Sequence, residues 1–301
     1  MSEIDSFQAW HNGKWVSWDS IRLDPMDRGV LVGDAVYEVE RTFGGQLFRL
    51  EDHIERLLYS CAYTRIDPGL SKEEFCDLTR ECMERNTRLI ESAQEVAAWQ
   101  YVSRGQGRRA TDATDPNVYI RLVPIDFSSH GRFYSGGLEL ATSRFSNLDA
   151  LNVDPRVKHV SRLHFALAEV AAAEISPNTW PLLLDQLGGV AEGPGFNVLA
   201  VRDGRLLSGV QADMLDGISR RTIIGLAESV GLTVEQKRLY PYDLLTADEV
   251  IVTATSFCML PVSKIDGVKF KAVPGPVTSA LTTAWSNMVG LDFVQQARQA
   301  I

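Results

Sequence analysis

Residues 36–50 read VYEVERTFGGQLFRL, a strand pattern on either side of the turn-forming pair Gly44-Gly45. The hydrophobic period then changes, because from Glu51 to Tyr63 the apolar side chains recur at the spacing of a helix. Strands and helices continue to mix along the chain, without the strict alternation of a doubly wound parallel sheet. The sequence therefore predicts an α/β (α+β) protein.

Local signals on each side of this stretch support that fold class. The pair Asn12-Gly13 lies between two short apolar runs and predicts a hairpin. Ser71 and Glu74 have the spacing of a capping box, which marks the start of a helix. Each signal is local, so each predicts an element and not its neighbours in space.

The length of 301 residues leaves room for two domains. Hydrophobic periodicity is lost over residues 126–135, which is typical of a connecting segment. We therefore expect a small N-terminal domain over residues 1–125, a linker over residues 126–135 and a larger C-terminal domain over residues 136–301.

Composition excludes several classes of function. The formal net charge of −9 argues against nucleic-acid binding, which needs a basic face. No stretch approaches the roughly 18 apolar residues of a membrane span, and the first residues lack the apolar core of a signal peptide, so we expect a cytoplasmic protein with no membrane partner. The four cysteines form no C-x-x-C pair and H-E-x-x-H is absent, so no metal site is expected.

Lys158 stands apart among the seven lysines. It comes just before residues 161–175, an Ala-rich apolar stretch that we expect to form a buried helix. Burial lowers the pKa of a lysine and makes its amine a nucleophile for carbonyl compounds. Lys158 is therefore the candidate nucleophile, with a solvent-exposed lysine as the plainer alternative.

Three further features follow Lys158 along the chain. Glu192 lies 34 residues later in a glycine-rich stretch, residues 188–197. Residues 215–220 form a glycine turn that opens a helix, and the free amides at a helix start bind anions. Hydroxyl groups at residues 253–256 directly follow a predicted strand, where they can accept a phosphate or cap the chain.

Taken in order, these features resemble the class IV, fold-type IV family of pyridoxal-phosphate aminotransferases. That family contains branched-chain aminotransferases, D-amino-acid aminotransferases, (R)-selective amine transaminases and aminodeoxychorismate lyases. The resemblance runs from Asp24 to about Thr278 and includes the stretches GDAVYEV at residues 33–39 and LEDHIERL at residues 50–57. It implies a two-domain fold with a small N-terminal α/β domain, a larger β-rich domain that binds pyridoxal 5'-phosphate, and a homodimer.

The resemblance also implies roles for single residues. Lys158 corresponds to the lysine that forms a Schiff base with the cofactor, and Glu192 to the partner of its pyridine nitrogen. Leu215 corresponds to the leucine that packs on the ring. The residues that correspond to phosphate ligands are Arg56, Ile218, Ser219 and Thr255. The family often has a tyrosine a few residues after the lysine; this chain has none there, and Arg162 and His164 are the alternatives.

The expected substrates are small amines or amino acids and keto acids. Tyr37 and Val39 resemble the D-amino-acid and (R)-amine groups more than the Phe-Glu-Gly of branched-chain enzymes, and Ser256 is a further expected substrate contact. Arg108 and Arg109 lie where those groups place an arginine for the acceptor carboxylate, and the sequence does not choose between them. We expect amino transfer from a D-amino acid or (R)-amine to pyruvate or 2-oxoglutarate. The alternatives are an L-branched-chain aminotransferase and a lyase of the aminodeoxychorismate type.

Overall fold

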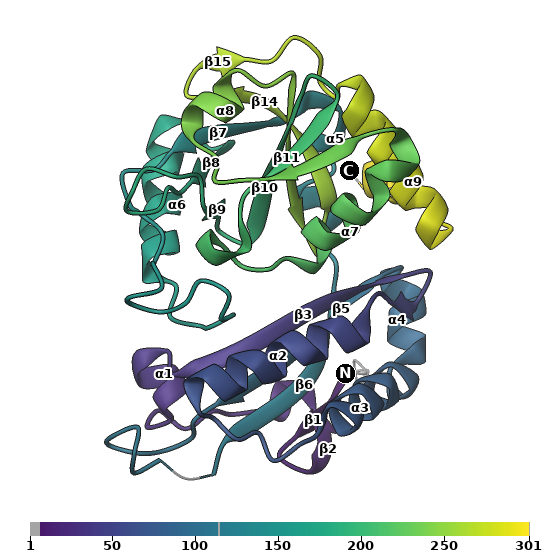
Figure 1. Ribbon diagram of the computed structural model, residues 1–301. Helices are drawn as coiled ribbons and strands as arrows, with labels where there is room; N and C mark the ends of the chain where they lie inside the picture. Colours follow the sequence, from purple (N-terminus) through teal and green to yellow (C-terminus); the bar gives the residue numbers. More distant parts are fainter. Residues whose placement is uncertain (1–6, 114, 301) are drawn as a thin grey trace. The chain divides into compact units, whose positions relative to one another are not determined.

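The computed structural model describes residues 7–113 and 115–300 (Figure 1). The chain divides into two compact units: Met1–Ile125 with Val157–Arg162, and Asp126–Arg156 with Leu163–Ile301. We propose these units as the two domains. The expected linker, residues 126–135, lies in the second unit and contains one short helix, Phe127–Ser129, and most of a second, Phe133–Gly136. Among the described residues, no helix is both long and apolar enough to cross a membrane.

The first unit contains an antiparallel sheet in the order β2-β1-β6-β5-β3-β4. Its strands are β1 (Gln8–His11), β2 (Lys14–Ser17), β3 (Ala35–Phe43), β4 (Gln46–Leu47), β5 (Val96–Ser103) and β6 (Asn117–Pro124). Its helices are η1 (Trp18–Ser20), α1 (Arg28–Val32), α2 (Leu50–Thr64), α3 (Lys72–Arg85) and α4 (Thr87–Ala93). The hairpin at Asn12-Gly13 and the capping box of Ser71 and Glu74 are both confirmed.

The two faces of this sheet differ because side chains alternate along each strand. Helix α2 packs on β3 and α3 packs on β6, where they bury the face that carries Glu38 and Gln100 (Figure 1). The opposite face carries the half-buried side chains of Tyr37, Trp99 and Arg121. We call it the aromatic face.

The second unit contains a mixed sheet in the order β12-β11-β10-β13-β14-β7-β8, with β15 paired to β14 and β9 to β10. The pairs β11–β12, β14–β7 and β7–β8 are parallel, and the other pairs are antiparallel. The strands are β7 (Leu138–Thr142), β8 (Thr179–Leu182), β9 (Glu192–Gly193), β10 (Phe196–Arg202), β11 (Arg205–Ser208), β12 (Thr233–Gln236), β13 (Glu249–Ala254), β14 (Cys258–Ile265) and β15 (Val268–Lys269).

Several helices of the second unit pack against its strands. The helices of this unit are η2 (Phe127–Ser129), α5 (Phe133–Gly136), α6 (Leu163–Ile175), η3 (Gln211–Asp213), α7 (Ile218–Leu226), η4 (Glu228–Val230), α8 (Pro241–Leu245), α9 (Pro276–Val289) and α10 (Phe293–Gln299). The prediction that the Ala-rich helix is buried was wrong for much of α6. Phe165, Ala168 and Ala172 pack inward, but the large apolar side chains at Leu163, Leu167, Val170 and Ile175 are exposed.

Candidate functional site

Lys158 is held in the first unit by the backbone of β3. The amide of Tyr37 donates to the carbonyl of Lys158 at 3.0 Å, and the amide of Val160 donates to the carbonyl of Ala35 at 2.9 Å. From the other side, the amide of Lys158 donates to Oγ of Ser60 on α2 at 3.2 Å. A segment far away in sequence is thereby fixed beside the strand that carries Tyr37.

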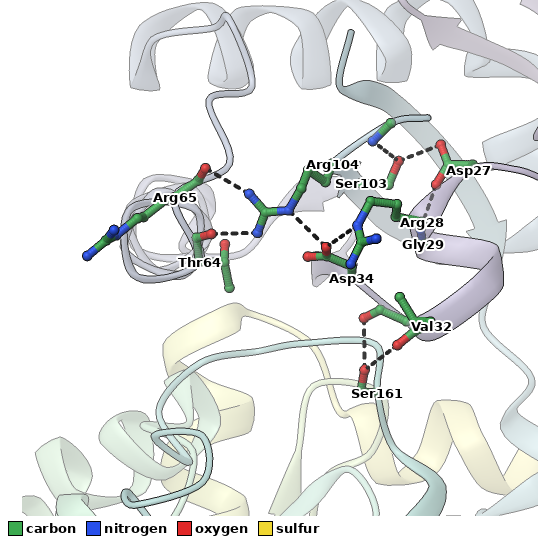
Figure 2. A network of polar contacts seen from close by, with 12 residues as sticks. Asp27, Arg28, Gly29, Val32, Asp34, Thr64, Arg65, Ser103, Arg104 and Ser161 are labelled. Atoms are coloured by element: carbon green, nitrogen blue, oxygen red, sulfur yellow. Dashed lines mark hydrogen bonds and ion pairs between the residues drawn. The ribbon is translucent and has the colours of Figure 1, made fainter. Parts of the chain in front are cut away.

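A polar network holds the start of β3 in turn (Figure 2). Arg28 and Arg104 both donate through Nε to the same carboxylate oxygen of Asp34, each at 2.8 Å. Ser161 Oγ donates to the carbonyls of Val32 and Gly33 at 3.1 and 2.9 Å. Although burial raises the pKa of Asp34, the two guanidinium groups hold it below its usual value. Asp34 therefore stays ionised and keeps both arginines in place.

Gly33 makes the close approach of Ser161 possible. Its φ of +68° is in the left-handed region, and a Cβ at this position would meet Ser161 Oγ at 2.5 Å. Gly33 lies just before Tyr37 in the chain and Ser161 just after Lys158. The two can be in contact because glycine has no side chain.

Two residues that the sequence singled out, Lys158 and Arg162, contact Tyr37. The amine of Lys158 lies 4.6 Å from the centre of the Tyr37 ring, and Arg162 donates a hydrogen bond to the Tyr37 hydroxyl. The Tyr37 ring also stacks with Trp99 at a centroid distance of 5.7 Å. Val39, the other predicted substrate contact on β3, is half-buried and lies opposite Trp99 in the register.

Arg56 lies on α2 and is buried in an ion pair. Its Nε and Nη2 donate to the two carboxylate oxygens of Glu38 at 2.6 and 2.9 Å, and His53 Nδ1 lies 2.8 Å from the same carboxylate. Although burial raises the pKa of Glu38, the Arg56 charge and the His53 hydrogen bond hold it well below its usual range. The sequence offered no sign that Glu38 is the partner of Arg56, because the two are on different elements.

Arg108 and Arg109 lie on the exposed loop between β5 and β6. Within residues 7–113 and 115–300, neither guanidinium makes a hydrogen bond or ion pair, while the backbone around them is anchored. The amide of Arg28 donates to the Gly105 carbonyl at 2.9 Å, and Arg28 Nη1 donates to the Arg108 carbonyl at 3.4 Å. Both side chains are thus free to bind an anion.

Glu192 in the second unit is buried and surrounded by donors. Its carboxylate accepts from the amide of Leu215 at 3.3 Å, from Asn147 Nδ2 at 3.4 Å and from Asn197 Nδ2 at 3.5 Å. Asn197 also donates to the Leu215 carbonyl at 3.0 Å. Nothing in the sequence points to Asn147, since a single polar residue in an irregular segment has no pattern.

The predicted phosphate residues of the second unit lie at two turns. Ile218 and Ser219 form the first turn of α7, directly after Gly217, and both are buried. A Cβ on Gly217 would meet Asn197 Oδ1 at 2.0 Å, so the chain passes very close to Asn197 there. Thr255 and Ser256 lie in the tight turn between β13 and β14, where Thr255 is half-buried and Ser256 is exposed.

The carboxylate, amides, hydroxyls and amine described above fit the groups of pyridoxal 5'-phosphate. A buried carboxylate held by three donors suits a protonated ring nitrogen. The free amides that begin α7 and the hydroxyls of Ser219 and Thr255 suit a phosphate, and the primary amine of Lys158 suits an aldehyde. Among the described residues no group of His, Cys, Asp and Glu is arranged to hold a metal ion.

Comparisons with known proteins identify the family. The family model described as amino-transferase class IV matches residues 35–265. A D-alanine aminotransferase of Bacillus licheniformis is 30% identical over 92% of this chain and 95% of that protein. A branched-chain-amino-acid aminotransferase of Pseudomonas aeruginosa is 27% identical over 93% and 92%. A branched-chain amino acid aminotransferase from Thermobaculum terrenum, solved in its PLP-form, has the same fold, with a TM-score of 0.81 at 25% identity over 98% of this chain and 97% of that one.

Proposed function

Since this chain belongs to the class IV aminotransferase family and is a pyridoxal-phosphate-dependent aminotransferase, we propose that its donor is a D-amino acid or an (R)-amine and its acceptor pyruvate or 2-oxoglutarate. The observation that carries this choice is the wall beside Lys158. It is formed by Tyr37, stacked on Trp99, with Val39 next along the same face. This wall lacks both the phenylalanine and the glycine that are usual in the branched-chain group.

Each site residue has a distinct task in this proposal. Lys158 would hold the cofactor through its amine and, as a general base, would take the proton from the substrate α-carbon. Glu192 would keep the ring nitrogen protonated, and Leu215 would pack on the ring. Arg56, Ile218, Ser219 and Thr255 are the residues that would bind the phosphate. When bound, the cofactor supplies a ring that takes up the electron pair left as the α-proton departs.

The loop arginines would bind the carboxylate of the acceptor. A guanidinium matches a carboxylate with two parallel hydrogen bonds, and Arg108 and Arg109 have no competing partner among the described residues. Because the loop is exposed, the same arginines can turn toward water when an apolar amine is bound. Ser256, also exposed, would add a hydrogen bond to the substrate.

A half-reaction panel tests the proposal. The absorbance band of the holoenzyme is followed with L-leucine, L-glutamate, D-alanine and both enantiomers of 1-phenylethylamine. We expect D-alanine or (R)-1-phenylethylamine to bleach it faster than L-leucine. Bleaching by L-leucine alone would instead identify a branched-chain enzyme, and release of a product without any acceptor would identify a lyase. The single variants Arg108→Gln and Arg109→Gln then show which arginine raises the affinity for pyruvate.

We further propose that the protein is a cytoplasmic homodimer. Exposed apolar side chains cluster on and before α1, at Met26, Val30, Leu31 and Val32, and a cluster of this kind commonly marks an interface. Sedimentation equilibrium tests this directly. If the loop acts on the partner's site, mixing inactive Lys158→Ala chains with inactive loop-arginine chains should restore part of the activity.

A further inference from the structure

Arg121 is a half-buried cation that no carboxylate of the described chain neutralises. Within residues 7–113 and 115–300 it has no ion pair and no hydrogen bond, and its Nε is buried without an acceptor. Arg56 and Arg104 in the same unit both pair with a carboxylate. Keeping an unpaired charge out of water costs free energy, and burial accordingly lowers the pKa of Arg121.

Aromatic rings hold this guanidinium in place. Its central carbon lies 3.9 Å from the centre of the Trp18 ring and 5.3 Å from the centre of the Trp99 ring. Trp18 in turn packs against Tyr119 at a centroid distance of 5.7 Å. Cation–π contacts fix the plane of an arginine without using its hydrogen-bond donors, so the donors of its two terminal nitrogens remain available for an anion.

Arg121 lies on the aromatic face of the first sheet, which also carries Tyr37, the ring beside Lys158. Trp99 is directly opposite Arg121 in the register of β5 and β6, and it stacks on Tyr37, which contacts the Lys158 amine. Two aromatic rings therefore separate the amine from the guanidinium. A molecule bound along this face has an amine-reactive end at Lys158, an apolar middle over Tyr37 and Trp99, and an anion-binding end at Arg121.

We propose that Arg121 binds a distal carboxylate of the substrate, so that the enzyme prefers elongated amines or ketones with an aromatic or apolar middle and an anionic group at the far end. The proposal rests on the aminotransferase function and adds the substrate class. Arg121 is then a specificity-determining residue, separate from the loop arginines, which would bind a carboxylate next to the reacting carbon.

Matched probes test the site by binding alone. 4-Acetylbenzoate and acetophenone differ only in the distal carboxylate, and isothermal titration calorimetry measures the affinity of each for the holoenzyme. We expect Arg121→Gln to lower the affinity for 4-acetylbenzoate by about 10- to 100-fold, the value of one charge-assisted pair. The affinity for acetophenone should fall by no more than about twofold. Arg121→Lys keeps the positive charge but cannot make two parallel hydrogen bonds to a carboxylate, so its affinity for 4-acetylbenzoate should lie between those of the parent and Arg121→Gln.

Arg85 provides the control. It lies 4.5 Å from the centre of the Trp15 ring but already pairs with Glu81, so Arg85→Gln should leave both affinities unchanged. Equal binding of the two probes to the unmodified enzyme, or equal losses for both in Arg121→Gln, would overturn the proposal and leave Arg121 as a packing residue. If Arg121→Gln fails to fold, as judged by thermal melting, the same comparison in Arg121→Lys decides.

Turnover separates this inference from the proposed function. The rate with (R)-4-(1-aminoethyl)benzoate should fall in Arg121→Gln far more than the rate with (R)-1-phenylethylamine. If no donor is turned over while 4-acetylbenzoate binding still depends on Arg121, the proposed function fails and the anion site stands. If both amines are turned over with equal losses, the anion site fails and the function stands.

Discussion

The amine of Lys158 lies 4.6 Å from the centre of the Tyr37 ring, and the hydroxyl of that ring accepts a hydrogen bond from Arg162. Two cationic side chains therefore act on one phenol. Although burial raises the pKa of Tyr37, the charges of Lys158 and Arg162 lower it below the ordinary value. This chain lacks a tyrosine shortly after its lysine, and Arg162 in that segment instead donates to Tyr37, the aromatic residue of β3 that the lysine also contacts.

Arg162→Gln should raise the pKa of Tyr37, because it removes both a nearby positive charge and a hydrogen-bond donor. The measurement is a titration followed by phenolate absorbance, with Tyr37→Phe subtracted to isolate this one tyrosine. Arg132→Gln is the control, since Arg132 packs on Phe133 in the second unit. An unchanged titration in Arg162→Gln would show that the Arg162 contact does not govern the phenol.

Borohydride should fix the cofactor to Lys158. Lys158 is backbone-bonded to β3 and its amine faces the Tyr37 ring, whereas Lys264 is occupied by an ion pair with Glu139. Peptide mapping after reduction should therefore find the label on Lys158 alone. Lys158→Ala should lose transamination by several powers of ten, and Lys264→Ala should keep both label and activity. A label on Lys264 or Lys237 would contradict the assignment.

Glu192→Gln should keep the cofactor but slow the half-reaction by roughly 10- to 100-fold, the rate equivalent of losing a charged hydrogen-bond partner at ~1.5–3 kcal/mol. A neutral amide cannot hold a proton on the ring nitrogen, although Asn147 and Asn197 remain to position it. Stopped-flow absorbance gives the rate. Glu249→Gln is a matched buried control in the same unit, because Glu249 pairs with Thr278 at the start of α9; it should lower stability without slowing chemistry.

Elements with a local signal could be predicted from the sequence, and contacts between distant elements could not. The Asn12-Gly13 turn, the Ser71 capping box and the alternation along β3 are each encoded within a few residues. The failure at α6 has the same origin. An apolar composition allows a helix to be buried, but the elements packed against it decide which side chains are covered. Within the described chain those elements leave Leu163 and Val170 mostly exposed.

In the candidate site, too, residues with a local signal could be predicted and contacts between distant elements could not. Lys158 and Glu192 are predicted as site residues because each lies in a distinctive local stretch. That the Lys158 segment belongs with β3, or that Arg56 pairs with Glu38, depends on contacts between elements far apart in the chain. Arg121 gave no signal either, since its unusual property is the lack of a carboxylate partner among the described residues, which only the folded chain reveals.

The buried carboxyl of Glu40 should make stability depend on pH. Gln100 Nε2 donates to its Oε1 at 2.6 Å, while Glu40 Oε2 and Gln100 Oε1 have no partner in the part of the chain that the structure describes. Burial raises the pKa of Glu40 well above the ordinary value, so the folded protein keeps a proton that the unfolded chain has released. Such a group loses its stabilising contribution as the pH rises from the unfolded pKa toward the folded one.

Glu40→Gln removes this dependence, because its amide is neutral at every pH and can donate to Gln100 Oε1. The two proteins are compared by thermal melting between about pH 5 and 8. The free energy of unfolding of the variant should increase relative to that of the parent as the pH rises, by at most about 1.4 kcal/mol per pH unit. Glu91→Gln, on the exposed surface of α4, is the control and should show no such trend. A difference between Glu40→Gln and the parent that stays constant or shrinks with pH would mean that Glu40 is ionised in the folded protein.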